Sequence, residues 1–139
     1  MIIAKMNNMI HNLVEQKDIK ETVIGSHKSV DYGHTITCTQ DPTSFDYILI
    51  YVFAPGEKRN VICVAKYYNG NWYSLAPATV NRTISLQITS SGTSLRIDIA
   101  EWVNASANNG CQIDAVVGVN RGGVIKALLR LIRKAVIGC

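Results

Sequence analysis

FDYILIYVF, residues 45–53, is the stretch that decides the fold. Aromatic and β-branched residues fill it at both odd and even positions, so an extended strand here would be apolar on both faces. Such a run is typical of a central strand that the core covers on one side and a second layer or subunit covers on the other. The sequence therefore predicts a β-sheet built around these residues.

The segments that follow this strand alternate between apolar and polar residues, as half-buried strands do. Three runs alternate most regularly: Ile84, Leu86 and Ile88; Leu95, Ile97 and Ile99; and Ile113, Ala115, Val117 and Val119. Turn signals punctuate the chain at residues 54–57, 69–70, 90–92 and 108–110. Six or seven short strands separated in this way favour a mainly β fold, an antiparallel, jelly-roll-like β-sandwich over residues 33–120.

A short helix is expected at the N-terminus, within a lead-in that covers residues 1–32. Apolar side chains recur there at helical spacing, and four of them also fit the a and d positions of a heptad. These four are Ile3, Met6, Ile10 and Leu13. Two heptads are too few for an independent coiled coil, so this helix would need a folded domain to hold its partners together.

The C-terminal segment, residues 121–139, is predicted to form an amphipathic helix at 123–137. It contains five basic residues and no acidic one, so it accounts for the whole formal charge of +4. Its basic face consists of Lys126, Arg130, Arg133 and Lys134. Such a helix fits a membrane surface, a nucleic acid, or docking by its apolar face. We favour docking, because the helix has no aromatic residue for interfacial anchoring or base stacking.

Composition excludes several classes of protein. A chain of 139 residues has the size of one domain. No apolar run approaches the length of about 18 residues that a spanning helix needs, so no transmembrane segment is expected. The start, MIIAKMNNMIHNL, is interrupted by polar residues and does not resemble a secretion signal, which favours a cytoplasmic location unless the protein belongs to a virion. The four cysteines are scattered singly and are expected to be buried free thiols.

No catalytic or metal-binding motif stands out, so the chain is expected to be no enzyme and to need no cofactor or metal. His27, Asp31 and His34 lack the paired spacing of zinc ligands. Asp98, Glu101 and Asp114 could approach one another across strands, but carboxylates on a sheet are usually solvated. A small hydrolase or lyase on a β-sandwich remains the enzymatic alternative.

One cluster of aromatic residues is a candidate saccharide-binding site. It lies around an Asn69-Gly70 turn and consists of Tyr67, Tyr68, Asn71, Trp72 and Tyr73. Alternate side chains of a hairpin face outward, and exposed rings beside amides suit a sugar, whose C–H face stacks on aromatic rings. The competing interpretation is ordinary cross-strand packing of aromatic side chains.

Three segments together resemble a known family. FDYILIYV at 45–52, LRIDI at 95–99 and CQIDAVVGV at 111–119 are similar to strands in the receptor-binding heads of bacteriophage tail-fibre and baseplate proteins. The resemblance covers about residues 33–120. It implies a jelly-roll-like sandwich, usually a homotrimer in a virion, that recognises a bacterial surface saccharide or protein without catalysis. The basic C-terminal helix departs from this pattern.

The sequence also predicts a homo-oligomer, a trimer before a dimer. Three apolar surfaces would have to be buried by a partner. They are the two-sided strand at residues 47–53, the heptad-like N-terminal stub and the wide apolar face of the C-terminal helix. We expect one or both terminal helices to pack against the sandwich or a neighbouring copy. A nucleic-acid partner is not expected.

Overall fold

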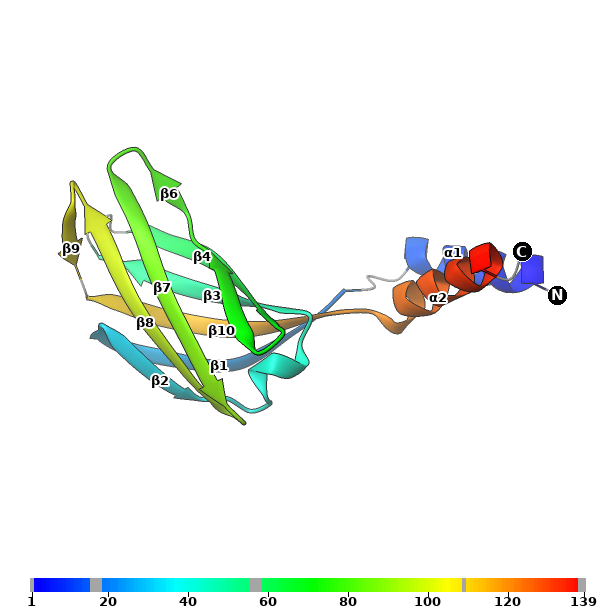
Figure 1. Cartoon of the computed structure of the whole chain (residues 1–139), viewed down its shortest axis with the longest axis horizontal. Helices are drawn as coiled ribbons and strands as arrows, with labels where there is room; N and C mark the ends of the chain where they lie inside the picture. Colours follow the sequence, from blue (N-terminus) through cyan, green and yellow to red (C-terminus); the bar gives the residue numbers. More distant parts are fainter. Residues whose placement is uncertain (1, 16–18, 56–58, 109, 138–139) are drawn as a thin grey trace. The chain divides into compact units, whose positions relative to one another are not determined.

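The structure is a computed structural model that describes residues 2–15, 19–55, 59–108 and 110–137. The chain divides into two compact units (Figure 1). The helical unit comprises Met1–Glu21 and Asn120–Cys139, and the sandwich unit comprises Thr22–Val119. The sandwich therefore begins at Thr22, earlier than the expected boundary at residue 33.

The sandwich unit consists of two antiparallel sheets (Figure 1). The first sheet has the strand order β1-β10-β3-β4-β5. Its strands are β1 (Ile19–Asp31), β10 (Cys111–Arg121), β3 (Tyr47–Ala54), β4 (Arg59–Tyr68) and β5 (Asn71–Leu75). The second sheet has the order β2-β8-β7-β6, with β9 paired to β8. Its strands are β2 (Gly33–Thr37), β8 (Ser94–Val103), β7 (Arg82–Ser91), β6 (Ala78–Thr79) and β9 (Ser106–Asn108).

Strand β3 lies in the middle of the first sheet, as its sequence predicts. Ile50 pairs with Val116 of β10 on one side and with Cys63 of β4 on the other. The strand alternates strictly between buried and half-buried residues, with Ile50 and Val52 fully buried on the inner face. The expectation that a second subunit covers its outer face stays a prediction.

The hydrophobic core lies between the sheets. It takes Ile50 and Cys63 from the first sheet, and Ile36 and Ile97 from the second. Each large aliphatic side chain that is fully removed from water contributes about 1.5–3 kcal/mol before ordering costs. The two alternating runs of the second sheet face one another in register, because Ile88 pairs with Ile97 across β7 and β8.

The strand order does not confirm the jelly-roll part of the expectation. The chain crosses between sheets from β1 to β2, from β2 to β3, from β5 to β6 and from β9 to β10, whereas β3–β4–β5 and β6–β7–β8 are meanders within one sheet. The mainly β, two-sheet antiparallel architecture with a helix near each end is confirmed.

Two of the expected turns are present as tight hairpins. Asn69 and Gly70 join β4 to β5 with positive φ angles of 50° and 85°, which is the conformation that an Asn-Gly type I′ turn requires. Gly92 also has a positive φ, and it joins β7 to β8. The expected turn at residues 54–57 lies partly outside the described residues, and so does the one at 108–110.

The cysteines of the sandwich unit are buried free thiols, as expected. Cys38, Cys63 and Cys111 are at most 4% exposed. Burial raises the pKa of Cys63 to about 12 and that of Cys111 to about 11. Both side chains are therefore protonated at neutral pH and behave as small apolar residues rather than nucleophiles. Cys139 lies outside the described residues.

The helical unit contains α1 (Ile2–Glu15) and α2 (Gly123–Ile137), close to both predicted helices. Each helix has an apolar stripe, so neither is stable without a partner surface. Several of the apolar side chains that the structure describes are nevertheless exposed, among them Ile3 and Val136, each 73% exposed. Among the described residues, no helix has the length and apolarity to cross a bilayer.

Candidate functional site

Two hairpin tips of the second sheet lie together at one end of the sandwich unit (Figure 1). Val80 and Asn81 connect β6 to β7, where Thr79 pairs with Arg82. Asn104 and Ala105 connect β8 to β9, where Val103 pairs with Ser106. Two-residue loops of this kind are the tightest hairpin connections, so the side chains they carry are held by the sheet rather than by a long loop.

The backbone joins and constrains these two tips. The Asn104 N–H donates a hydrogen bond of 2.9 Å to the carbonyl oxygen of Asn81. Asn104 and Ala105 both have positive φ angles, 49° and 66°. Asparagine tolerates this left-handed conformation, whereas alanine pays for its Cβ there with about 1–2 kcal/mol. A strained alanine at a hairpin tip is the kind of outlier that accumulates at binding sites.

A cleft of about 440 Å3 lies between the tips. Its lining residues are Val80, Asn81, Arg82, Thr83, Trp102, Asn104 and Ala105. Strand β8 places Trp102 on the outside of the sheet, because its neighbour Glu101 faces the core and is 1% exposed. Trp102 is 41% exposed, and Asn81 and Asn104 line the cleft with it. An aromatic ring that shares a cleft with two asparagines is suited to a ligand with one apolar and one hydroxyl-rich side.

Sequence reasoning missed this cleft. Trp102 stands alone in a strand-like run, and the tripeptide Asn104-Ala105-Ser106 gives no sign of ligand binding. The two-residue loops after Thr79 and Val103 become evident only from the strand ends in the structure. Only the pairing of β7 with β8, which sets Thr83 opposite Trp102, brings the tips to the same end.

The predicted aromatic hairpin forms, but its residues divide between two faces of the first sheet. Tyr67 pairs with Trp72, and their ring centroids lie 5.4 Å apart in an edge-to-face arrangement. The Trp72 indole N–H donates a hydrogen bond of 2.9 Å to Ser90 Oγ on β7. Trp72 also packs against the core. Trp72 therefore joins the two sheets at this end, and Tyr67 packs against its ring.

The remaining members of the predicted site face outward. Tyr68 pairs with Asn71, and Tyr73 is the cross-strand partner of Lys66. Tyr68 is 65% exposed and Tyr73 is 57% exposed. Both rings are accessible to a ligand. They lie on an open sheet face that also exposes Ile62 and Leu75, and they do not line the cleft that contains Trp102.

The two histidines considered as metal ligands do meet. His27 Nδ1 and His34 Nδ1 lie 2.9 Å apart, so one imidazole donates to the other. Burial lowers the pKa of His34, and the adjacent His27 lowers it further. Within the described parts of the chain, no three His, Cys, Asp or Glu side chains gather as metal ligands would. The hydrogen bond between His27 of β1 and His34 of β2 joins these two strands.

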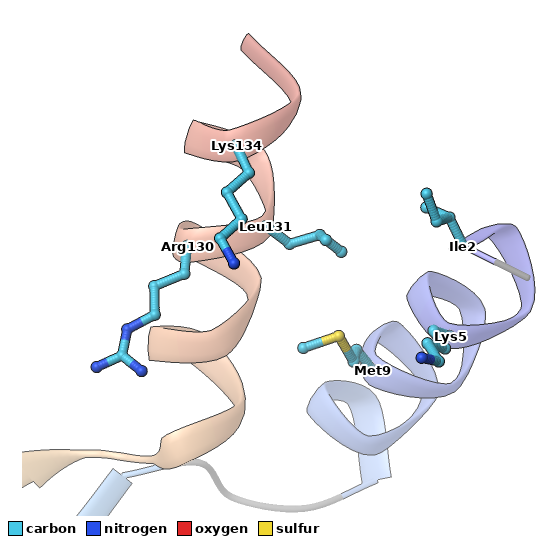
Figure 2. Close-up of a pocket in the computed structure, with 6 residues that line it drawn as sticks. All are labelled: Ile2, Lys5, Met9, Arg130, Leu131 and Lys134. Atoms are coloured by element: carbon cyan, nitrogen blue, oxygen red, sulfur yellow. The ribbon is translucent and has the colours of Figure 1, made fainter. Parts of the chain in front are cut away.

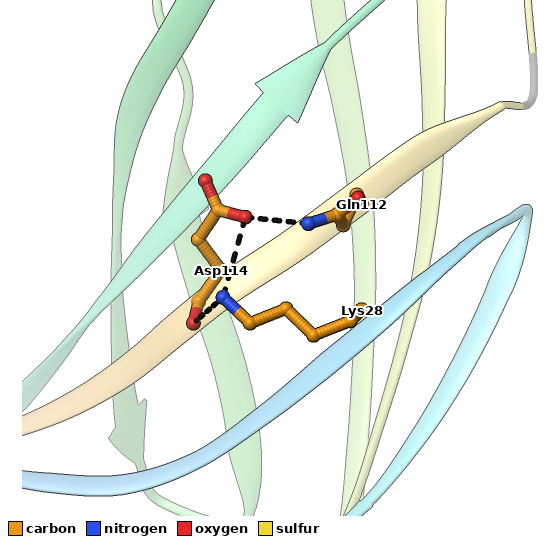
Figure 3. A network of polar contacts seen from close by, with 3 residues as sticks. All are labelled: Lys28, Gln112 and Asp114. Carbon is orange, nitrogen blue, oxygen red and sulfur yellow. Dashed lines mark hydrogen bonds and ion pairs between the residues drawn. The ribbon is translucent and has the colours of Figure 1, made fainter.

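The acidic side chains that could have formed a catalytic pair have structural partners. Asp98 Oδ1 lies 3.0 Å from the Arg96 guanidinium. Asp114 accepts a hydrogen bond from Gln112 and lies 3.6 Å from the Lys28 ammonium (Figure 3). Lys28 also donates to the Asp114 carbonyl oxygen, which ties β1 to β10 at the point where the β10 register shifts.

The structure describes only part of the predicted basic face of α2. Arg130, Arg133 and Lys134 are exposed, whereas the side chain of Lys126 lies outside the described residues.

Scans of family models and searches of curated proteins and of solved structures find no match to the chain.

Proposed function

We propose that the protein is a non-enzymatic, phage-type host-recognition component that binds a bacterial surface saccharide. The cleft beside Trp102 is the observation that carries this proposal, because it combines a half-exposed indole with amide groups on rigid hairpin tips. A pyranose ring presents C–H groups that stack on an indole and hydroxyl groups that bond to amides and guanidinium groups. The phage-type part of the proposal rests on the three segments that resemble phage receptor-binding heads, at residues 45–52, 95–99 and 111–119.

The hairpin side chains Tyr68, Asn71 and Tyr73 form a second, more open part of the proposed saccharide surface. Their exposure supports this role. Tyr67 and Trp72 contribute less in this proposal, because their rings pack against one another and Trp72 is bonded to Ser90 of the second sheet. Their substitution would act mainly on folding.

The proposal includes a virion location and assembly into a homo-oligomer, a trimer before a dimer. The outer face of the first sheet supports the assembly. Its edge strand β5 exposes Tyr73 and Leu75, and neighbouring β4 exposes Ile62 and Val64. An apolar face beside an unpaired strand edge is a surface that proteins usually cover. Light scattering on the full chain measures this directly, and a monomer at micromolar concentration would contradict it.

A bacterial glycan array, followed by titration calorimetry with the strongest ligand, tests the binding proposal. The Trp102→Ala variant is expected to bind about tenfold more weakly, which corresponds to about 1.4 kcal/mol. Tyr32→Ala provides the matched control, because it also removes an exposed ring but lies outside both the cleft and the Tyr67–Tyr73 hairpin. Wild-type affinity in Trp102→Ala, or no binding to any glycan, would contradict the proposed function.

A further inference from the structure

The helical unit contains a small apolar pocket between α1 and α2 (Figure 2). Its volume is about 240 Å3, and its lining residues are Ile2, Lys5, Met9, Arg130, Leu131 and Lys134. Figure 2 shows Met9 of α1 and Leu131 of α2 pointing toward one another across the pocket. Three of the six lining residues are cations and none is an acid, so the pocket joins an apolar interior to a positively charged rim.

The positive charge at the pocket rim belongs to a wider difference in charge between the two units. Three lysines and three acids balance within residues 1–21, whereas residues 120–139 contain five basic residues and no acid. The helical unit therefore has a formal charge of +5. The sandwich unit, with six basic and seven acidic residues, has a charge of −1. The cations are concentrated in the unit that also exposes apolar side chains.

A second observation comes from the apolar stripe of α2. Leu129, Ile132 and Val136 recur at helical spacing and are 41%, 46% and 73% exposed. On α1, Ile2 is 67% exposed. Arg133 and Lys134 lie beside this stripe in the sequence and are exposed as well. An apolar stripe on one face of a helix with cations on its other face is the pattern of a helix that lies in a membrane interface.

The charges discriminate between the partners that could cover this surface. A second copy would cover the stripe but would leave the cations on the other face of each α2 without an acidic partner on that helix. A nucleic acid would neutralise the cations but would leave the aliphatic stripe in water. An anionic lipid bilayer satisfies both features, because its headgroups attract the cations while its acyl chains accept the apolar side chains.

We propose that the helical unit binds the surface of an anionic lipid bilayer. Leu129, Ile132 and Val136 enter the boundary between headgroups and acyl chains. Arg130 and Lys134 on the polar face of α2, together with Lys5 of α1, attract the anionic headgroups. The attachment is peripheral and depends on charge, so raising the salt concentration weakens it.

Flotation of the full chain with lipid vesicles tests this proposal. Vesicles of equal parts phosphatidylglycerol and phosphatidylcholine are expected to bind the protein in 0.1 M salt and to release most of it in 0.5 M salt. Vesicles of phosphatidylcholine alone are the control for surface charge, and they are expected to bind weakly. Equal binding to both vesicle types, or no binding to either, would overturn the proposal.

Two variants locate the contact. Arg130→Gln with Lys134→Gln should weaken vesicle binding about 30-fold, because each cation near an anionic surface contributes about 1 kcal/mol. Lys66→Gln with Arg96→Gln removes the same charge from the sandwich unit and should change binding less than threefold. Equal losses in the two double variants would overturn the assignment to the helical unit.

A third variant separates the bilayer from the other two partners. Ile132→Asp should abolish vesicle binding without changing the mass measured by light scattering. A lower oligomer mass combined with unchanged vesicle binding would assign the stripe to a second copy and overturn the proposal. Binding of a DNA duplex that Arg130→Gln with Lys134→Gln weakens, with no vesicle binding in the wild type, would overturn it in favour of nucleic acid.

Discussion

The sandwich unit and the helical unit both have regular apolar patterns in the sequence, but these patterns have different outcomes in the structure. In the sandwich unit, Ile50 and Ile97 are fully buried, because each sheet lays its apolar face against the other. In the helical unit, Ile132 is 46% exposed and Val136 is 73% exposed. Periodicity therefore predicts which side chains seek cover, whereas only the tertiary arrangement determines whether the chain itself supplies it.

The largest expected effect is a difference in stability loss between a substitution in the sandwich unit and one in the helical unit. Ile50→Ala should lower the free energy of unfolding by about 2–5 kcal/mol, because it removes buried atoms and leaves a cavity. Ile132→Ala should change it by less than about 1 kcal/mol, because about half of this side chain remains in water. Urea unfolding followed by circular dichroism measures both values. Similar losses in the two variants would show that the α2 stripe is buried in solution.

A second substitution examines how tightly the sandwich interior is packed. A Cβ on Gly118 would overlap the ring of Phe45, which lies directly over this glycine. Gly118→Ala should therefore destabilise the protein by about 1–3 kcal/mol, since overpacking forces neighbouring atoms to move. Thermal unfolding measures the loss. An unchanged melting temperature would mean that Phe45 does not occupy this position.

Acidification should weaken the sandwich unit through its buried histidine. The pKa of His34 is lowered by burial and by His27, while the Asp31 carboxylate and the backbone near Cys111 act in the opposite direction. Below the ordinary value of 6.5 the unfolded chain binds a proton that the folded chain refuses. Stability should thus be fully present above pH 6.5 and should fall as the pH drops below it.

The size of this effect is limited by the one proton involved, so the slope is at most about 1.4 kcal/mol per pH unit. Urea midpoints between pH 5 and pH 8 measure it, with His34→Gln as the variant that removes the titrating group. A slope that persists unchanged in His34→Gln would assign the pH dependence to other groups.

The main part of the fold is predictable from the sequence, for identifiable reasons. The two-sided apolar character of β3 marks it as a central strand, and the alternation at Leu95, Ile97 and Ile99 identifies the inner face of β8. Strand β1 was missed because only Ile24 of its 13 residues is buried. A strand with one buried side chain leaves no periodic signal.

The candidate site was less predictable than the fold. The sequence shows that Tyr67 to Tyr73 form a hairpin, but it does not show that Trp72 reaches Ser90 on the other sheet. The cleft beside Trp102 depends on two tips that are 23 residues apart in the chain and meet through the Asn104–Asn81 hydrogen bond. Long-range pairing of this kind leaves no local trace.

The smallest expected effect concerns the strained tip of this cleft. Ala105→Gly should raise the free energy of unfolding by about 1 kcal/mol, because glycine adopts a φ of 66° without a steric penalty. Ser106→Gly is a control at the neighbouring position, where the strand conformation gives no such gain. Thermal unfolding measures both. A loss of stability in Ala105→Gly would contradict the strained conformation.

The most direct test of the saccharide-binding proposal is the location of a bound sugar on the full chain. Nuclear magnetic resonance of labelled aromatic rings can follow Trp102, Trp72 and Tyr73 separately while the strongest glycan from the array is added. We expect large shifts of the Trp102 indole signals and little change at Trp72, whose N–H is bonded to Ser90. Shifts confined to Tyr73, or an unperturbed Trp102 at saturating glycan, would contradict the proposal.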